Sequence, residues 1–252
     1  MDWKTINGAH IDLDDPSNPV TGSGKMSSLH ESNQNKPKGK NSPVNKTPKT
    51  AKAPKTTEKT LTSNKQNGNL NKTNFKTPTN DYAQKSSEAF EKQLTTKQYG
   101  AIEQYTGQSY ARINGFLRGV PGFEKLSTEL KGVIKDANAA LKSYDLKEDI
   151  KVFRNVEEAG YEAIKAAFEK GEPFTEKGFM STSTDAGTFS FGSNCHIEVE
   201  VPKGKGRGAF IQSISQFSSE KEFLIPSGKS FDIVEFDDSD KYDVKVKLRM
   251  KV

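Results

Sequence analysis

Residues 242–252 read YDVKVKLRMKV and give the clearest structural signal in the chain. Apolar residues at every second position alternate with polar ones, and side chains on a strand alternate between its two faces. One face of this strand is therefore expected to be buried. Shorter runs that we interpret as strands precede it at 150–154, 179–182, 188–191, 196–201, 209–214, 222–225 and 231–236. The C-terminal part of the chain thus predicts a sheet.

A helical pattern comes before these strands. Apolar side chains recur at helical spacing between residues 82 and 141, and Thr95 and Gln98 have the spacing of a capping box. One more helix is expected at 157–170, where Gly171 ends it. Helices followed by many strands predict an α+β domain, in which N-terminal helices pack on a mixed β-sheet.

The composition changes upstream of this domain, which we place at residues 82–252. Residues 26–80 are rich in Lys, Asn, Thr, Pro and Ser and poor in large apolar side chains, so they are expected to form a disordered linker. Residues 31–80 contain eleven Lys and two Glu, so the positive net charge belongs to this linker. Residues 1–25 include a turn signal at Asn7-Gly8 between two short extended runs. This segment is too small to fold alone, so it is expected either to be disordered or to dock on a partner.

Several classes of protein and site are disfavoured. Cys195 is the single cysteine and is expected to be a buried structural thiol, so there is no disulfide framework. The histidines His10, His30 and His196 are too scattered for a metal site. No signal peptide and no membrane-spanning run is found. The run Gly204–Gly208 lies between two expected strands, which favours a hairpin over a dinucleotide-binding loop.

Polar motifs border the expected strands in a definite order. Arg154 ends one strand, and a guanidinium can bind phosphate bidentately. The hydroxyl run Ser181–Ser183 ends another. Glu220 and Glu222 are two apart on an expected strand, which would put both on one side, about 7 Å apart. Taken singly, these motifs also fit a surface salt bridge, a turn and a charged strand end. Together they indicate a site that binds an anionic dinucleotide and stabilises positive charge on a ribose.

The arginine, the Ser-Thr-Ser run and the Glu-x-Glu pair, in this order, resemble the arginine-specific mono-ADP-ribosyltransferases. The resemblance is strongest to the enzymatic components of clostridial binary toxins, the vegetative insecticidal toxins and the Rho-modifying exoenzymes. Residues 105–114, YTGQSYARIN, are similar to the helical segment with which that family covers NAD. The resemblance spans about residues 82–252 and implies the ADP-ribosyltransferase fold, NAD as a substrate and no metal.

The resemblance also implies roles for single residues. Arg154 would bind the diphosphate of NAD, Ser181 would hold Glu222 in place, and Ser183 would support the site. Glu222 would bind the ribose 2′-hydroxyl and stabilise the oxocarbenium ion as nicotinamide leaves. Glu220 would orient or deprotonate an acceptor guanidinium, and relatives with glutamine here modify asparagine, so Glu220 favours a protein arginine.

Further residues would complete the site. Tyr105, Tyr110 and Asn114 would line the NAD pocket. Phe189 or Phe191 would pack near the nicotinamide, and we prefer Phe191. The loop 213–219, which carries Phe217, would recognise the target protein. Asn155 follows Arg154 where many relatives have glycine or a second basic residue, and no further arginine follows the aromatic before Arg207.

Other functions remain open at this point. The same fold would serve a catalytically silent adaptor or virion-associated protein, because residues 5–11 weakly resemble pieces of bacteriophage head-associated proteins. The linker would attract nucleic acid through its lysines, although it lacks interleaved aromatic side chains, and RNA stays open as an acceptor. Without a signal peptide, we expect delivery by a phage particle or a non-classical route into the cytoplasm of a target or host cell.

Overall fold

The structure is a computed structural model that describes residues 3–6, 9–12, 19–20, 74–156, 158–188 and 194–252. Our expectations for Phe189 and Phe191, for most of the 26–80 linker and for most of the 188–191 strand lie outside these residues. Near the N-terminus, β1 (Trp3–Ile6), β2 (Ala9–Asp12) and β3 (Pro19–Val20) form a small antiparallel sheet, with Ile6 opposite Ala9. The two short extended runs expected around Asn7-Gly8 are thus present as β1 and β2.

Helices occupy the first part of the domain, as predicted. They are α1 (Asn80–Glu91), α2 (Thr96–Gln104), the π-helix η1 (Tyr105–Ser109), α3 (Tyr110–Arg118), α4 (Thr128–Ser143) and, later, α5 (Glu158–Lys170) and the 3₁₀ turn η2 (Ser218–Glu220). The capping box is confirmed, because Thr95 N donates to Gln98 Oε1 at 3.0 Å and Gln98 N donates to Thr95 Oγ1 at 3.3 Å. Within the described parts of the chain, we find no helix whose length and apolarity would let it cross a bilayer.

Eight strands form one mixed sheet with the order β10-β11-β7-β5-β8-β13-β12-β6. Their bounds are β5 (Ile150–Val156), β6 (Phe174–Glu176), β7 (Met180–Ser183), β8 (Cys195–Val201), β10 (Ala209–Phe210), β11 (Glu222–Ile225), β12 (Lys229–Asp237) and β13 (Val244–Met250). The pair β8 and β13 is parallel and the other pairs are antiparallel. Separately, β4 (Asp145–Leu146) pairs with β9 (Gly204–Lys205). The predicted α+β class is confirmed.

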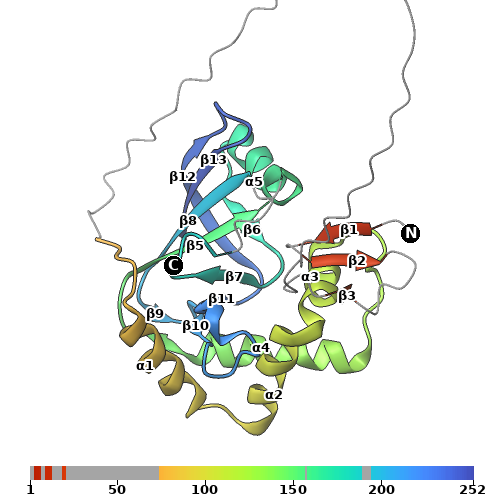
Figure 1. Cartoon of the computed structure of the whole chain (residues 1–252), viewed down its shortest axis with the longest axis vertical. Coiled ribbons are helices and arrows are strands. Elements are labelled where there is room, and N and C mark those ends of the chain that lie inside the picture. The colour runs from red at the N-terminus through yellow and green to blue at the C-terminus, as the bar shows by residue number, and fades with distance from the viewer. Residues whose placement is uncertain (1–2, 7–8, 13–18, 21–73, 157, 189–193) are drawn as a thin grey trace, which may run out of the picture. The chain divides into compact units, whose positions relative to one another are not determined.

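Two apolar clusters flank strands β7 and β11. One cluster gathers the inward residues of the sheet together with residues of α5, and the other gathers apolar residues of α1, α2, α3 and α4. Phe223 of β11 belongs to the first cluster and its neighbour Leu224 to the second. In Figure 1, α1, α2 and α4 accordingly lie below the sheet, and α5 lies near its upper end. Strands β7 and β11 therefore sit at the boundary between the two cores.

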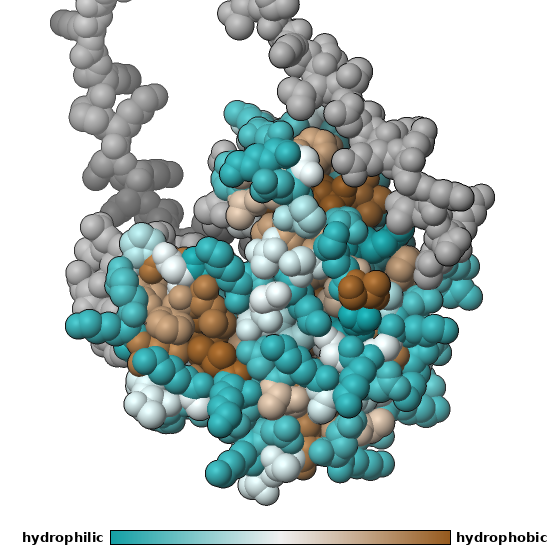
Figure 2. Space-filling model, turned by 180° about the vertical axis from the view of Figure 1, so that it is seen from behind, coloured by the Kyte–Doolittle hydropathy of each residue, from teal (hydrophilic) through white to brown (hydrophobic). Residues whose placement is uncertain are grey.

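Hydrophilic residues predominate on the face seen in Figure 2, where hydrophobic residues form separate patches. Along β13, Val244, Val246, Leu248 and Met250 are buried, while the residues between them are exposed or half-buried. The predicted alternation is thus confirmed over residues 244–250, whereas Tyr242 and Val252 are exposed, and the outer face of this strand is polar.

Two expectations for strands need correction. The strand predicted at 209–214 ends at Phe210, because the chain turns at Ile211, whose carbonyl accepts hydrogen bonds from Ile214 N at 2.9 Å and Ser215 N at 2.8 Å. Its remaining apolar residues pack in the helical cluster instead of alternating along a strand. The edge strand β6 was not predicted, because three residues are too short for a visible alternation.

Two glycine substitutions test the packing of α3 against the turn that follows it. A Cβ on Gly115 would lie 2.6 Å from Cγ of Phe123, whereas a Cβ on Gly132, inside α4, would meet nothing within 4 Å. We expect Gly115→Ala to destabilise the fold by about 1 to 3 kcal/mol through overpacking. The matched change Gly132→Ala should stabilise it by about 1 kcal/mol through helix propensity. Urea unfolding of both variants measures the difference, and equal effects would contradict this packing.

Candidate active site

Pairing of β7 with β11 brings the hydroxyl run next to Glu222. Glu222 lies opposite Ser183, and Leu224 lies opposite Ser181. Opposite residues of an antiparallel pair share a face, so Ser181, Ser183 and Glu222 lie on one side of the two strands. Thr182 points to the other side, where its Oγ1 donates to Phe223 O at 2.7 Å. The register therefore presents two of the three hydroxyls to the carboxylate.

The carboxyl of Glu222 is buried, with 5% of the residue exposed. Burial raises its pKa to about 7, because the charged form loses its hydration. A hydrogen bond from Ser181 and the charge of Arg154 lower this pKa, and the nearby charge of Glu220 raises it. A buried carboxyl with a raised pKa is typical of a functional site and not of a strand end that is exposed to solvent.

Glu220 is close to Glu222, but not for the reason expected from the sequence. The two glutamates do not share a strand: Glu220 ends the 3₁₀ turn η2, Lys221 is left-handed at φ 49° and ψ 45°, and β11 begins only at Glu222. Ser183 holds this turn by donating to Glu220 O at 2.8 Å. Burial raises the pKa of Glu220 to about 7. The left-handed residue, costly for a side chain with a Cβ, redirects the chain between the two acids.

A buried chain of hydrogen bonds connects the helices to β7. The hydroxyl of Tyr105 is hydrogen-bonded to Ser181 and accepts a hydrogen bond from Asn114 Nδ2 at 3.0 Å. Asn114 Oδ1 in turn accepts from Phe179 N at 2.9 Å. Tyr105 is only 1% exposed, and burial raises its pKa to about 12. These contacts give Tyr105 and Asn114 a positioning role under Ser181, while their direct contact with NAD stays a prediction.

Tyr110, the first residue of α3, lies near Glu220. It is half-buried, and burial followed by the charge of Glu220 raises its pKa. Its side chain therefore borders Glu220 rather than Ser181. Whether NAD contacts Tyr110 stays a prediction.

Two arginines approach the site from different elements. The Nη1 of Arg154, near the end of β5, donates to Ser181 O at 2.8 Å. Arg118, at the end of α3, binds Glu176 bidentately through Nε at 2.8 Å and Nη2 at 3.0 Å. Burial and then the charge of Arg118 lower the pKa of Arg154, so the two guanidinium groups are neighbours. Sequence reasoning missed Arg118, although its spacing of four residues from Asn114 puts both on one face of α3.

The loop 213–219 is tied to the helices at several points. Ser213 N donates to Ser87 Oγ of α1 at 3.0 Å, and the side chain of Gln216 lies against Gly107 of η1, where a Cβ would come within 2.8 Å of its Nε2. Phe217 is half-buried, and its N donates to Ser215 Oγ at 3.1 Å. The loop thus leads into Glu220 from an anchored base. The predicted role of Phe217 in target recognition stays a prediction.

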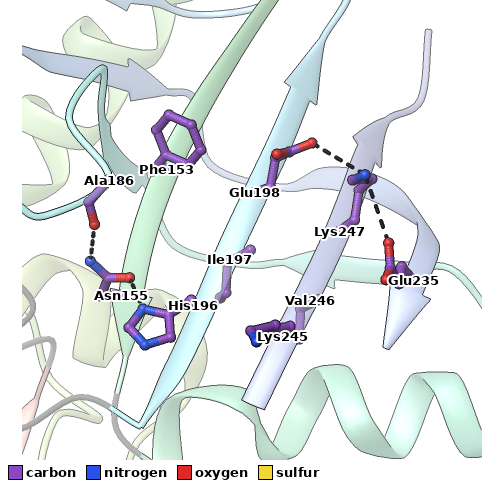
Figure 3. Close-up of a pocket in the computed structure, with 10 residues that line it drawn as sticks. All are labelled: Phe153, Asn155, Ala186, His196, Ile197, Glu198, Glu235, Lys245, Val246 and Lys247. Atoms are coloured by element: carbon purple, nitrogen blue, oxygen red, sulfur yellow. Dashed lines mark hydrogen bonds and ion pairs between the residues drawn. The ribbon is translucent and has the colours of Figure 1, made fainter. Parts of the chain in front are cut away.

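A cavity of about 350 Å³ lies on the polar face of the sheet. Figure 3 shows Asn155 there, between Ala186 and His196. Its Nδ2 donates to Ala186 O at 2.8 Å and to Thr188 O at 2.9 Å, and its Oδ1 is 2.7 Å from His196 Nδ1. Asn155 therefore ties the segment after β7 to β5. None of Glu222, Glu220 and Ser181 lines this cavity.

A comparison of the sequence with known protein families shows the family of this domain. The sequence pattern of the ADP-ribosyltransferase exoenzyme family matches residues 79–251. The chain belongs to this family. The matched region contains all the residues of the site described above.

Among the described residues, no three His, Cys, Asp or Glu side chains are grouped so that they could hold a metal ion.

Known proteins show the same fold. The chain resembles Plx2a, an ADP-ribosyltransferase toxin from Paenibacillus larvae, with a TM-score of 0.56 and 24% identity over 68% of this chain and 94% of that one. It also resembles the C3 exoenzyme of Clostridium limosum, with a TM-score of 0.59 and 23% identity over 71% and 98% of the two chains. At these identities the likeness concerns the fold of the domain.

A curated relative is the NAD(+)–arginine ADP-ribosyltransferase of Enterococcus faecalis. It is 29% identical over 140 residues, which make up 52% of this chain and 27% of the relative. The match thus spans about a quarter of the length of that protein.

The raised pKa of Glu222 should make the stability of the protein depend on pH. Its folded pKa of about 7 lies above the ordinary value of 4.5, so the folded state binds the proton more tightly and stability falls as the pH rises between these values. Glu222→Gln should therefore raise stability at pH 8 by an amount on the order of 1 to 3 kcal/mol, and should have little effect at pH 4. Thermal unfolding at both pH values measures this, and a variant destabilised at pH 8 would contradict the burial argument.

Proposed function

We propose that this domain transfers ADP-ribose from NAD to the guanidinium of an arginine in a target protein and releases nicotinamide. The observation that carries the proposal is a buried carboxyl, Glu222, held by Ser181, beside Arg154 on one side and Glu220 on the other. Family membership supports NAD as the substrate. The activity of the relative from E. faecalis, named as an arginine ADP-ribosyltransferase, supports arginine as the acceptor.

The chemistry begins at the ribose of the nicotinamide. The bond between its anomeric carbon and the nicotinamide nitrogen breaks, and the electron pair leaves with nicotinamide. The ribose then carries positive charge, as in the oxocarbenium-like transition states that carboxylates stabilise in glycoside chemistry. The Glu222 carboxylate, fixed by Ser181, supplies this stabilisation without reorganising. Arg154 binds the diphosphate through charge-assisted hydrogen bonds, and the ion pair of Arg118 with Glu176 lies beside it.

The second step takes place at the acceptor. A guanidinium nitrogen attacks the anomeric carbon and must lose a proton as the new bond forms. Glu220 is suited to accept this proton, because its pKa of about 7 lies near neutral pH. Its position on the turn before β11 places it next to Glu222 and at the end of the loop 213–219, which would contact the target. Transfer should therefore increase as the pH rises through about 7.

Two isosteric changes separate the two steps. Glu222→Gln should lower both nicotinamide release and arginine modification about 10³-fold, because the charge at the ribose is no longer stabilised. Glu220→Gln should lower arginine modification about 10²- to 10⁴-fold and leave NAD hydrolysis within about tenfold, because a guanidinium must lose a proton to become a nucleophile, whereas an attacking water can release its proton to the solvent. Chromatography of nicotinamide and labelling of an arginine-containing peptide measure the two activities.

Glu235→Gln is the matched control, since Glu235 is exposed on β12 and should leave both activities unchanged. Full transfer activity in both the Glu222 and the Glu220 variants would contradict the proposed assignment of the active site. A wild-type protein that releases no nicotinamide would instead support the catalytically silent adaptor.

A further inference from the structure

The glycine-rich run Gly204–Gly208 has no part in the transfer reaction, yet it is closely fitted into the fold. Gly204, Gly206 and Gly208 have φ values of 125°, 74° and 125°, which favour glycine. A Cβ on Gly208 would lie 2.5 Å from Leu224 O of β11, and one on Gly206 would lie 3.2 Å from Lys142 O of α4. The hairpin is therefore packed between α4 and β11.

This packing places Arg207 in an unusual environment. Its guanidinium lies over Gly204, with Nε 3.6 Å and Nη2 3.8 Å from the position that a Cβ would take there. The Nε is buried, and within the described part of the chain it has no hydrogen-bond partner. Buried donors in folded proteins nearly always have an acceptor. An acceptor from outside the chain could not reach this enclosed atom, but it could meet the other guanidinium nitrogens of the half-buried Arg207.

Two lysines lie beside Arg207 at the C-terminal end of α4. Gly206 N donates to Tyr144 O at 2.8 Å, which ties the hairpin to the end of the helix that carries Lys142. Asn138 and Ser227 exchange hydrogen bonds of 2.8 and 3.1 Å, which tie the turn before Lys229 to the same helix. Burial, and then the charges of Arg207 and Lys142, lower the pKa of Lys229.

The positive charge of this group is not balanced within the described residues. No ion pair there involves Lys142, Arg207 or Lys229. The negative end of the α4 dipole amounts to about half a charge, which accounts for one cation at most. Three cations and an unsatisfied guanidinium N–H exceed what the fold needs at this helix end.

We propose that Lys142, Arg207 and Lys229 bind a phosphate group. The Arg207 guanidinium forms directed, charge-assisted hydrogen bonds to phosphate oxygens. The ammonium groups of Lys142 and Lys229 balance the second negative charge of the phosphate. The site is separate from the transfer site: Glu222 begins β11, whereas the turn that carries Lys229 follows its other end, so about 10 Å of strand lies between them. The proposal does not depend on the proposed function.

Nuclear magnetic resonance of the full chain tests this directly. Inorganic phosphate is titrated at constant ionic strength, and the Nε–H signal of Arg207, assigned by its loss in Arg207→Lys, is followed. We expect a saturable shift of this signal. Lys229→Gln and Lys142→Gln should each weaken binding about tenfold, the effect of losing one charge-assisted contact. Lys131→Gln is the matched control, because it removes one exposed lysine from the same helix about 16 Å from Lys142.

The outcomes separate the sources of the phosphate. Tighter binding of adenosine monophosphate than of inorganic phosphate would identify a nucleotide as the ligand, and equal binding would identify a free phosphate; both support the site. No saturable shift up to about 10 mM, a concentration at which specific recognition would be detectable, overturns it. Equal weakening in Lys131→Gln, or binding lost in Arg154→Gln but kept in Lys229→Gln, also overturns it. Unchanged melting temperatures of the lysine variants show that each is folded.

Discussion

The arrangement of this domain depends on one buried carboxyl. Removing a charged carboxylate from water is costly unless hydrogen bonds and opposite charges compensate. Glu222 receives a hydrogen bond from Ser181 and the field of Arg154, yet burial still raises its pKa to about 7. The remaining cost must be covered by the packing around it. Glu222 begins β11, whose next residues belong to both apolar clusters, so the carboxyl sits where the two cores meet.

The helices support this carboxyl through Ser181. Tyr105 and Asn114 form a buried chain that ends at Ser181 on one side and at the backbone of Phe179 on the other. Tyr105 begins the segment η1, in which the helix kinks at Gly107, whose ψ of −111° is not helical. Asn114 and Arg118 lie on one face of α3. This single helix therefore positions the hydroxyl of Tyr105, through Asn114, and also carries the guanidinium of Arg118. Tertiary packing thus sets the geometry of groups that the transfer reaction requires.

The second acid, Glu220, is held in a different way. It belongs to a 3₁₀ turn and a loop that is anchored to Ser87 and Gly107, whereas Glu222 belongs to the sheet. Under the proposed function, acceptor chemistry and cleavage chemistry therefore rest on different elements. On that proposal, a change in the loop would alter the acceptor site without disturbing the ribose site.

The sequence by itself determined the α+β class and most of the helices and strands. The alternation at 242–252 and the capping box at Thr95 are local patterns, since they depend on residues two or three positions apart. The order of Arg154, the serines and the glutamates also sufficed to indicate the family. Only the tertiary structure decided that Glu220 leaves the strand and that Tyr105 lies beneath Ser181. It also paired Arg118 with Glu176, 58 residues away. Such contacts join distant segments, and no local periodicity records which distant partner a side chain will meet.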